Sequence, residues 1–253
     1  MVKQVAAPVV SRTELMPGAH LFWLWAPQIA KVAKPGQFVM VRCGEGHQPL
    51  LRRPLSIHRI ADGEQVALLF SVVGQGTSLL SRYREGDKLD LLGPLGNGFS
   101  LYPGSSKLLL VAGGVGIAPL VFLADKALDQ RRAVVLLAGS ATASLLYPRS
   151  LLPSSVDLVI ATEDGSDGQR GAITDLLGDF VNWADQVFAC GPLPMYQSMS
   201  ACGFGGPKSV QVCLETAMAC GLGACYGCTV KTKRGLRQVC QDGPVFELDD
   251  ILW

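Results

Sequence analysis

The stretch LLLVAGGVGIAPL, residues 108–120, decides the fold of the second half of this chain. Its first five residues, Leu108–Ala112, form an apolar run that predicts a buried β-strand. The glycines that follow permit a tight turn, and the next apolar residues predict a helix that ends near Asp129. The uncharged run has the length of a membrane span, but its glycines and proline interrupt it. A strand, a turn and a helix therefore explain it better.

Three more apolar segments follow and predict further strands of the same sheet: Ala133–Ala138, Val156–Ala161 and Gln186–Ala189. Helical or loop segments separate them. Strands that alternate with helices are typical of a parallel sheet with helices on its faces. We therefore expect an α/β domain over residues 101–205.

The residues before this unit contain short strands rich in Val, Ile, Leu and Phe, separated by Pro-Gly or Asp-Gly turns. The clearest are His20–Ala26, Gln37–Arg42, Pro54–Ile60 and Gln65–Val72. Their length and spacing are typical of a small antiparallel barrel, which we expect over residues 1–100. The expected fold class is thus α/β plus all-β.

A cysteine-rich run, CGLGACYGC, begins at Cys220 near the C-terminus. Cys220, Cys225, Cys228 and Cys240 are spaced C-x4-C-x2-C-x11-C, and the first part of this pattern is the spacing of plant-type [2Fe–2S] ligation. Small residues between the thiolates let such a loop wrap a cluster and direct backbone N–H groups at sulfur. We expect residues 206–253 to form a small cluster module whose fold depends on the metal centre.

Two other uses of these cysteines remain open. Structural zinc sites also use C-x2-C, but they usually pair two such knuckles, whereas one arm here is C-x4-C. Disulfides need an oxidising compartment, and the N-terminal residues contain no apolar core of the length of a secretory signal. We expect a cytoplasmic protein, where eight cysteines favour metal or redox chemistry.

Charge and hydropathy narrow the possible partners. Lys and Arg number 22 and Asp and Glu 21, so the net charge of +1 indicates neither nucleic acid nor an anionic membrane. Hydrophobic residues make up 49% of the chain and charged residues 17%, which is compatible with burial of surface against a protein partner.

Two short motifs in the expected barrel suit a phosphate-bearing ligand. Arg53 begins the segment Arg53–Ser56 at the start of a strand, and arginine binds phosphate in a bidentate way. Gly74–Thr77 opens an expected helix, where N–H groups after Gly76 would receive a pyrophosphate. A surface arginine and an ordinary turn are the alternatives.

Three segments of the expected α/β domain suit a ligand that carries a pyrophosphate. They are the glycine turn after Ala112, the run Thr162–Gly165, and Cys190–Pro192, and each follows a strand. Ligands bind at the carboxyl ends of parallel strands. Acidic Glu163 and the lack of an arginine pair close to Ser140 disfavour a 2′-phosphate, so NAD is preferred over NADP if the ligand is the nicotinamide cofactor that the resemblance described below implies. The alternative for Cys190 is a small buried residue that closes a strand.

In this order and context, these motifs resemble the ferredoxin reductase superfamily. Its flavin motif is Arg-x-Tyr-Ser/Thr, and here Leu55 occupies the aromatic position. The resemblance implies that the Ser56 hydroxyl lies near the reactive N5 of FAD and that Cys190 and Gly191 lie beside the nicotinamide.

The strings LLRRPLSI, LLGPLGNGF, VAGGVGIAPL, CGPLPM, CGLGACYGC and VCQDGPVF occur in one order along essentially the whole chain. Together they resemble the electron-transfer subunits of type B dihydroorotate dehydrogenase. One departure is Ser71, where the resemblance leads us to expect an arginine after Phe70.

The resemblance implies three cofactors, FAD, a [2Fe–2S] cluster and NAD, and a set of residues for each. For FAD these are Arg53, Pro54, Leu55, Ser56, Leu69, Phe70, Ser71, Gly76 and Thr77. For NAD they are Gly113, Gly114, Gly116, Glu163, Cys190 and Gly191. The cluster ligands are Cys220, Cys225, Cys228 and Cys240.

The implied partner is an FMN-containing catalytic subunit that oxidises dihydroorotate in pyrimidine biosynthesis, in a heterotetramer of two plus two chains. Electrons would pass from FMN through the cluster to FAD and then, as hydride, to NAD⁺. No catalytic residue is expected in this chain, because the abstraction of protons from dihydroorotate belongs to the partner.

Two other functions remain open. One is the flavin subunit of a ferredoxin–nicotinamide transhydrogenase or a hydrogenase, although four cysteines in place of three and an aspartate disfavour the transhydrogenase. The other is a non-enzymatic, zinc-stabilised binding module.

Overall fold

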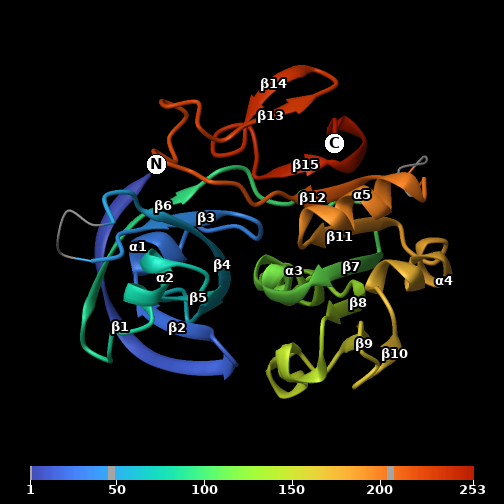
Figure 1. Cartoon of the computed structure of the whole chain (residues 1–253), viewed down its shortest axis with the longest axis horizontal. Coiled ribbons are helices and arrows are strands. Elements are labelled where there is room, and N and C mark those ends of the chain that lie inside the picture. The colour runs from blue at the N-terminus through green and yellow to red at the C-terminus, as the bar shows by residue number, and fades with distance from the viewer. Residues whose placement is uncertain (1, 45–48, 204–207) are drawn as a thin grey trace.

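The computed structural model describes residues 2–44, 49–203 and 208–253. A barrel formed by the first third of the chain lies beside a larger sheet, and a hairpin near the C-terminus lies above both (Figure 1). No helix in these described residues is long and apolar enough to cross a membrane.

The first unit is a closed barrel with the strand order β1-β2-β5-β4-β3-β6, and every neighbouring pair is antiparallel. Its strands are β1 (Lys3–Met16), β2 (Ala19–Trp25), β3 (Phe38–Val41), β4 (Arg53–Ala61), β5 (Gln65–Ser71) and β6 (Lys88–Leu95). Two short helices, α1 (Pro27–Ala30) and α2 (Gln75–Leu80), lie in its connections. The prediction of an antiparallel barrel is confirmed.

The second unit is a seven-stranded sheet with the order β10-β9-β8-β7-β11-β12-β15. Its strands are β7 (Lys107–Gly113), β8 (Ala133–Ser140), β9 (Val156–Thr162), β10 (Gln169–Arg170), β11 (Gln186–Cys190), β12 (Val210–Cys213) and β15 (Val245–Glu247). All pairs are parallel except β12 with β15. The predicted parallel sheet is confirmed.

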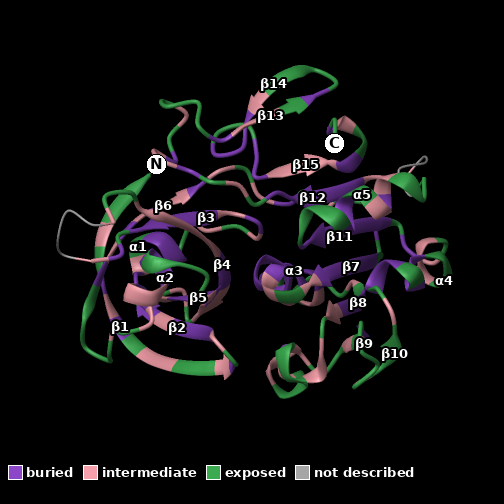
Figure 2. Cartoon of the chain, viewed as in Figure 1, coloured by how far each residue is buried: buried purple, intermediate pink, exposed green. Residues whose placement is uncertain are grey.

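Helices cover both faces of the sheet, and the side chains of β7 point alternately to one face and the other. Leu108 and Leu110 pack with helix α3 (Ile117–Asp129), whereas Leu109 and Val111 pack with helices α4 (Leu177–Val181) and α5 (Leu193–Ala201). Because successive side chains of a strand point to opposite faces, a strand buried on both faces is apolar throughout. Figure 2 shows the central strands buried accordingly.

In the part of the chain that the structure describes, the remaining helical elements are five short 3₁₀ turns: η1 (Gly114–Gly116), η2 (Ala143–Leu145), η3 (Arg149–Leu151), η4 (Ile173–Leu176) and η5 (Leu248–Asp250).

Residues after 205 are shared between the sheet and a separate hairpin. β12 and β15 extend the sheet, and the backbone N–H of Leu214 donates to the carbonyl of Pro244 at 2.8 Å where the chain leaves and rejoins it. Between them lie the cysteine loop and a hairpin of β13 (Thr229–Thr232) and β14 (Gly235–Gln238). The division into three domains stays a prediction.

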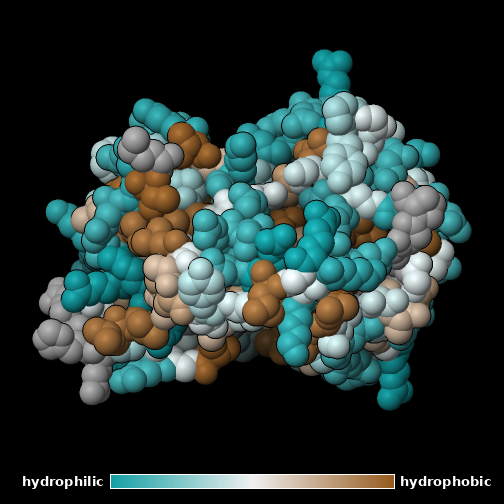
Figure 3. All heavy atoms as spheres, turned by 90° about the horizontal axis from the view of Figure 1, so that it is seen from above, coloured by the Kyte–Doolittle hydropathy of each residue, from teal (hydrophilic) through white to brown (hydrophobic). Residues whose placement is uncertain are grey.

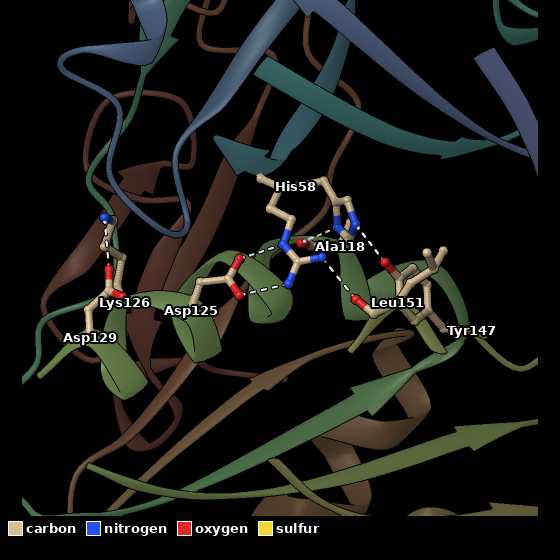
Figure 4. Close-up of polar contacts among 8 residues, drawn as sticks. His58, Ala118, Asp125, Lys126, Asp129, Tyr147 and Leu151 are labelled. Carbon is tan, nitrogen blue, oxygen red and sulfur yellow. Dashed lines mark hydrogen bonds and ion pairs between the residues drawn. The ribbon is translucent and has the colours of Figure 1, made fainter. Parts of the chain in front are cut away.

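Polar side chains of β4 in the barrel form hydrogen bonds and an ion pair with α3 and with the segment after β8 (Figure 4). His58 Nδ1 lies 2.9 Å from the carbonyl oxygen of Ala118, and its Nε2 lies 3.0 Å from the hydroxyl of Tyr147. Since a carbonyl only accepts, Nδ1 carries the hydrogen and Nε2 accepts from Tyr147. Arg59 donates to both oxygens of Asp125 at 2.6 and 2.7 Å.

Lowering the pH should reduce the stability of the folded protein, because His58 in this contact would become protonated. Burial lowers the pKa of His58 from 6.5 to about 4 in the folded protein. The unfolded state therefore binds more protons between pH 6.5 and 4, so stability is full above that window and falls as the pH is lowered through it. The loss from this group should reach about 3 kcal/mol at pH 4. Urea unfolding of wild type and His58→Gln across this window measures it, and equal pH slopes would contradict it.

Candidate functional site

A cavity of about 420 Å³ lies between the barrel and the sheet. Eight residues of the predicted flavin set line it: Arg53, Pro54, Leu55, Ser56, Leu69, Phe70, Ser71 and Thr77. They come from the start of β4, the end of β5 and helix α2. The opposite wall comes from the glycine turn after β7 and from the residues after β12. The volume suits a planar organic ligand.

The ninth residue of that set, Gly76, lies beneath Arg53 and does not line the cavity. A Cβ atom on Gly76 would lie 2.7 Å from Nε of Arg53, so only glycine lets the guanidinium lie against α2. Arg53 donates from Nη1 to the carbonyl of Leu51 at 2.7 Å and pairs with no carboxylate among the described residues. Its charge is therefore available to a phosphate.

Thr77 fixes the loop that precedes α2. Its hydroxyl oxygen accepts from the N–H of Val73 at 2.9 Å and from that of Gly74 at 3.2 Å. The remaining N–H groups in the first turn are those that a helix leaves without an intrahelical acceptor. Arg53 and the start of α2 thus provide positive charge and N–H donors at one end of an otherwise apolar cavity.

A second cavity, of about 600 Å³, opens at the carboxyl ends of the parallel strands. Five residues of the predicted nicotinamide set line it: Gly113, Gly114, Gly116, Glu163 and Gly191. A Cβ on Gly116 would lie 2.2 Å from the carbonyl oxygen of Cys190, so this close approach of two chain segments requires glycine.

Cys190, the sixth residue, lies behind this cavity. It is fully buried at the end of β11. The neighbouring N–H of Gly191 donates at 2.9 Å to the hydroxyl of Tyr196, which donates at 2.7 Å to the carbonyl of Cys213. These bonds connect β11, α5 and β12 beneath the cavity floor.

The sequence did not indicate the residues after β12. Leu214, Glu215, Thr216 and Met218 line the first cavity, and Glu215 lines the second as well. These residues lie just beyond the carboxyl end of a parallel strand, where ligands bind in such sheets. The sequence alone could not predict this, because it does not show that β12 pairs with β11.

The four predicted ligand cysteines lie in two pairs joined by backbone contacts. The N–H of Gly223 lies 3.2 Å from Sγ of Cys240, and the N–H of Cys240 lies 3.4 Å from Sγ of Cys228. The thiols of Cys220 and Cys225 are in contact, as are those of Cys228 and Cys240.

This arrangement fits the donor set of a two-iron cluster, in which four thiolates serve two irons. Within the described residues, no group of three or more His, Cys, Asp or Glu side chains is arranged to hold a single metal ion. Burial opposes ionisation of Cys220, but N–H groups of the loop, beginning with that of Leu222, outweigh it and lower its pKa to about 6. Donors directed at sulfur favour thiolate.

The cysteine loop also adjoins the first cavity. Gly221 has φ of +71°, and a Cβ there would lie 2.6 Å from Cγ of Met40 on β3. Met218 lines the cavity two residues before Cys220. The cysteine loop therefore lies next to the first cavity, and the first cavity lies next to the second.

Comparison with known proteins gives consistent relatives. A family model described as the iron-sulfur cluster binding domain of dihydroorotate dehydrogenase B matches residues 215–252. A protein of Desulforamulus reducens is 38% identical over 261 residues and covers 100% of both chains. One of Clostridium acetobutylicum is 41% identical over 214 residues, with 84% of each chain covered. Both are called dihydroorotate dehydrogenase B (NAD(+)), electron transfer subunit.

Solved structures show the same architecture. An NADH-dependent reduced ferredoxin-NADP oxidoreductase has a TM-score of 0.88 and 29% identity, and the match covers 98% of this chain and 90% of that one. A ferredoxin NADP+ reductase from Neisseria gonorrhoeae, with bound FAD and NADP, has a TM-score of 0.66 and 20% identity, with 79% and 89% covered. The second likeness concerns the fold alone.

The cysteine assignment can be checked by metal analysis. Protein purified without oxygen should contain about two irons and two acid-labile sulfides per chain. Cys225→Ala should lose them, because one iron would lack a thiolate. Cys202→Ala is the matched control, since this exposed cysteine lies at the end of α5 and should leave the cluster intact. One zinc and no sulfide would contradict the assignment.

Proposed function

The chain belongs to the family of dihydroorotate dehydrogenase B electron transfer subunits, and we propose that it carries electrons from a dihydroorotate-oxidising partner to NAD⁺. The observation that supports this most is the contiguity of the three sites. The cysteine loop adjoins the first cavity through Met218, and the first cavity adjoins the second at Val115 and Glu215. No finding favours the transhydrogenase, hydrogenase or zinc-module alternatives.

FAD occupies the first cavity in this proposal, and it supplies the conversion between single electrons and hydride. Arg53, supported by Gly76, binds its pyrophosphate together with the first turn of α2. The apolar side chains of Leu55, Leu69 and Phe70 exclude water from the ring. Because Leu55 has no aromatic ring, Met218 is left to cover the flavin, and Ser71 leaves phosphate binding to Arg53.

NAD⁺ occupies the second cavity. The glycine turn after β7 lets its pyrophosphate approach the backbone at the start of α3. Glu163 places a carboxylate in this cavity, which favours a ribose hydroxyl over a 2′-phosphate. The face of the nicotinamide then lies toward the first cavity, where hydride is exchanged.

The partner surface in this proposal is the face that carries the cysteine loop, seen from above in Figure 3, where apolar side chains lie among polar ones. Leu222 and Tyr226 of the loop are 53% and 70% exposed, and Leu236 on β14 of the neighbouring hairpin is 69% exposed. Docking there brings a partner's redox group near the cluster. We infer that this partner contains FMN, that the complex has two copies of each subunit, and that it works in the cytoplasm.

Arg53→Ala should weaken FAD binding by about 1.5–3 kcal/mol, the size of a charge-assisted hydrogen bond. Isothermal titration of the apoprotein measures this, with exposed Arg82→Ala as the matched control. FMN should bind more weakly than FAD to wild type, because it lacks the pyrophosphate. Equal affinity of wild type for FMN and FAD would rule out the assignment.

Coupling to the partner is the direct test of function. Alone, the loaded chain should oxidise NADH with artificial acceptors and leave dihydroorotate unchanged. With the catalytic subunit, reduction of NAD⁺ should depend on dihydroorotate. A Cys228→Ala variant that still assembles and retains FAD should lose this coupling, whereas Cys202→Ala should keep it. Coupling at the normal rate in the Cys228→Ala complex would show that the route bypasses the cluster.

A further inference from the structure

The hydroxyl group of Tyr196 lies between two strands of the parallel sheet, at the end of the sheet that borders both cavities. Tyr196 is on α5, and its side chain is buried, with 2% of its surface exposed. The N–H of Gly191, just after β11, donates to this hydroxyl at 2.9 Å. The hydroxyl in turn donates to the carbonyl of Cys213, the last residue of β12, at 2.7 Å. One oxygen atom thus connects the ends of two neighbouring strands.

These two bonds take the place of one bond of the ladder between β11 and β12. The N–H of Val187 donates to the carbonyl of Ser209 at 3.1 Å. Because such bonds are evenly spaced in a parallel ladder, Gly191 would donate to Cys213 four residues farther along each strand. The regular pairing of β11 stops before this point, at Ala189. The hydroxyl is therefore inserted where a direct bond of about 2.9 Å would form, and it holds the strand ends apart.

The two residues that the hydroxyl connects belong to different cavities. Gly191 lines the second cavity, and Cys213 lines the first. Tyr196 itself lines neither cavity as the described residues define them. The separation of the two strand ends therefore sets how far a wall of the nicotinamide site lies from a wall of the flavin site.

The other side of the turn after β11 is fixed by close packing. A Cβ on Gly113 would lie 2.7 Å from Cδ of Pro192. A Cβ on Gly116 would lie 2.2 Å from the carbonyl oxygen of Cys190. The turn is thus packed against the glycines after β7, and its distance from β12 depends on the hydroxyl.

The ring of Tyr196 is itself held in place by stacking. The indole of Trp253 lies over it with ring centroids 5.5 Å apart and the two planes at 16°. The N–H of Leu252 donates to the carbonyl of Lys231 on β13 at 3.1 Å, which anchors this segment on the hairpin. The position of the hydroxyl is therefore fixed from two directions, by α5 and by the residues after η5.

We propose that Tyr196 is a positioning residue for hydride transfer, and that its hydroxyl sets the spacing between the nicotinamide and the flavin. The inference rests on the proposed function. In that reaction the N5–H bond of the reduced flavin breaks and a C4–H bond of the nicotinamide forms: FADH⁻ + NAD⁺ → FAD + NADH. The rate depends steeply on the placement of the two reacting atoms, so a shift of the strand ends by less than the width of an atom affects it.

Tyr196→Phe removes the hydroxyl and keeps the ring that stacks on Trp253. The full chain, loaded with FAD and its cluster, is mixed rapidly with NADH, and the limiting rate of flavin reduction is measured separately from the Kd for NADH. The limiting rate should fall about 100-fold, the loss expected for a misplacement of about 1 Å. The Kd should stay close to that of wild type, because Tyr196 lines neither cavity. Exposed Tyr102→Phe is the matched control and should behave as wild type.

Two further readouts do not depend on activity. The long-wavelength charge-transfer absorbance of reduced flavin with NAD⁺ should weaken in Tyr196→Phe, because it requires closely stacked rings. In crystal structures of the loaded chain, N of Gly191 and O of Cys213 should move from the separation spanned by the hydroxyl to a direct hydrogen bond of about 2.9 Å.

Trp253 provides a second pair of variants, since it is 39% exposed and its replacement should leave the fold intact. Trp253→Ala frees the ring of Tyr196 and should slow flavin reduction by less than Tyr196→Phe does. Trp253→Phe retains a stacked ring and should restore most of the rate.

The proposal requires the slower transfer and the closer strand ends to occur together. A wild-type limiting rate in Tyr196→Phe would overturn it, even if the variant unfolds at a lower temperature, because a structural role alone has that result. If Tyr196→Phe does not fold, a wild-type rate in Trp253→Ala would overturn it. If wild type itself shows no reduction of its flavin by NADH, the proposed function fails instead, so the two failures are distinguishable.

Discussion

The parallel pairing of β12 with β11 is the interaction on which the rest of the structure depends. Val187 pairs with Val210 and Ala189 with Val212, so a strand from the cysteine-rich segment becomes part of the dinucleotide-binding sheet. Without this pairing, neither Glu215 nor the cysteine loop would have a fixed position relative to the first cavity. The backbone bonds of four residues thus set the distance between redox centres that lie far apart in the sequence.

Helix α3 makes the second essential contact. Nine of its thirteen residues are buried, because one side packs on the sheet and the other on β4 of the barrel. A helix that is apolar nearly all round requires two partners. Its three charged residues are near its C-terminal end: Asp125 is half-buried and is neutralised by Arg59, and the exposed Lys126 and Asp129 pair with each other. The cavity between the two units is therefore bounded by a rigid contact, which suits a site where two ligands must meet face to face.

The sequence predicted most of the local structure, and the structure brings together the four cysteines that it singled out, whose role as ligands stays a prediction. The run Leu108–Ala112 indicated β7 because its composition is local information, and the same holds for the predicted barrel strands. The position of β12 could not be predicted, because four apolar residues carry no sign of which strand they will pair with. Glu215 could not be singled out for the same reason, since its position beside both cavities depends on that pairing. Arg53 and Gly76 were recognised as a pair only because both belong to family motifs.

The hydrogen bond from Leu214 to Pro244 has a further consequence. The cysteine loop and the hairpin form one long loop whose two ends are held together, since the chain leaves the sheet after β12 and returns to it at the neighbouring β15. The cost of closing such a loop is met by sheet pairing and grows slowly with loop length. We therefore expect this long loop to unfold and refold locally while β12 and β15 stay paired in the sheet. We therefore expect that a cluster can be inserted or removed without unfolding the barrel and the sheet.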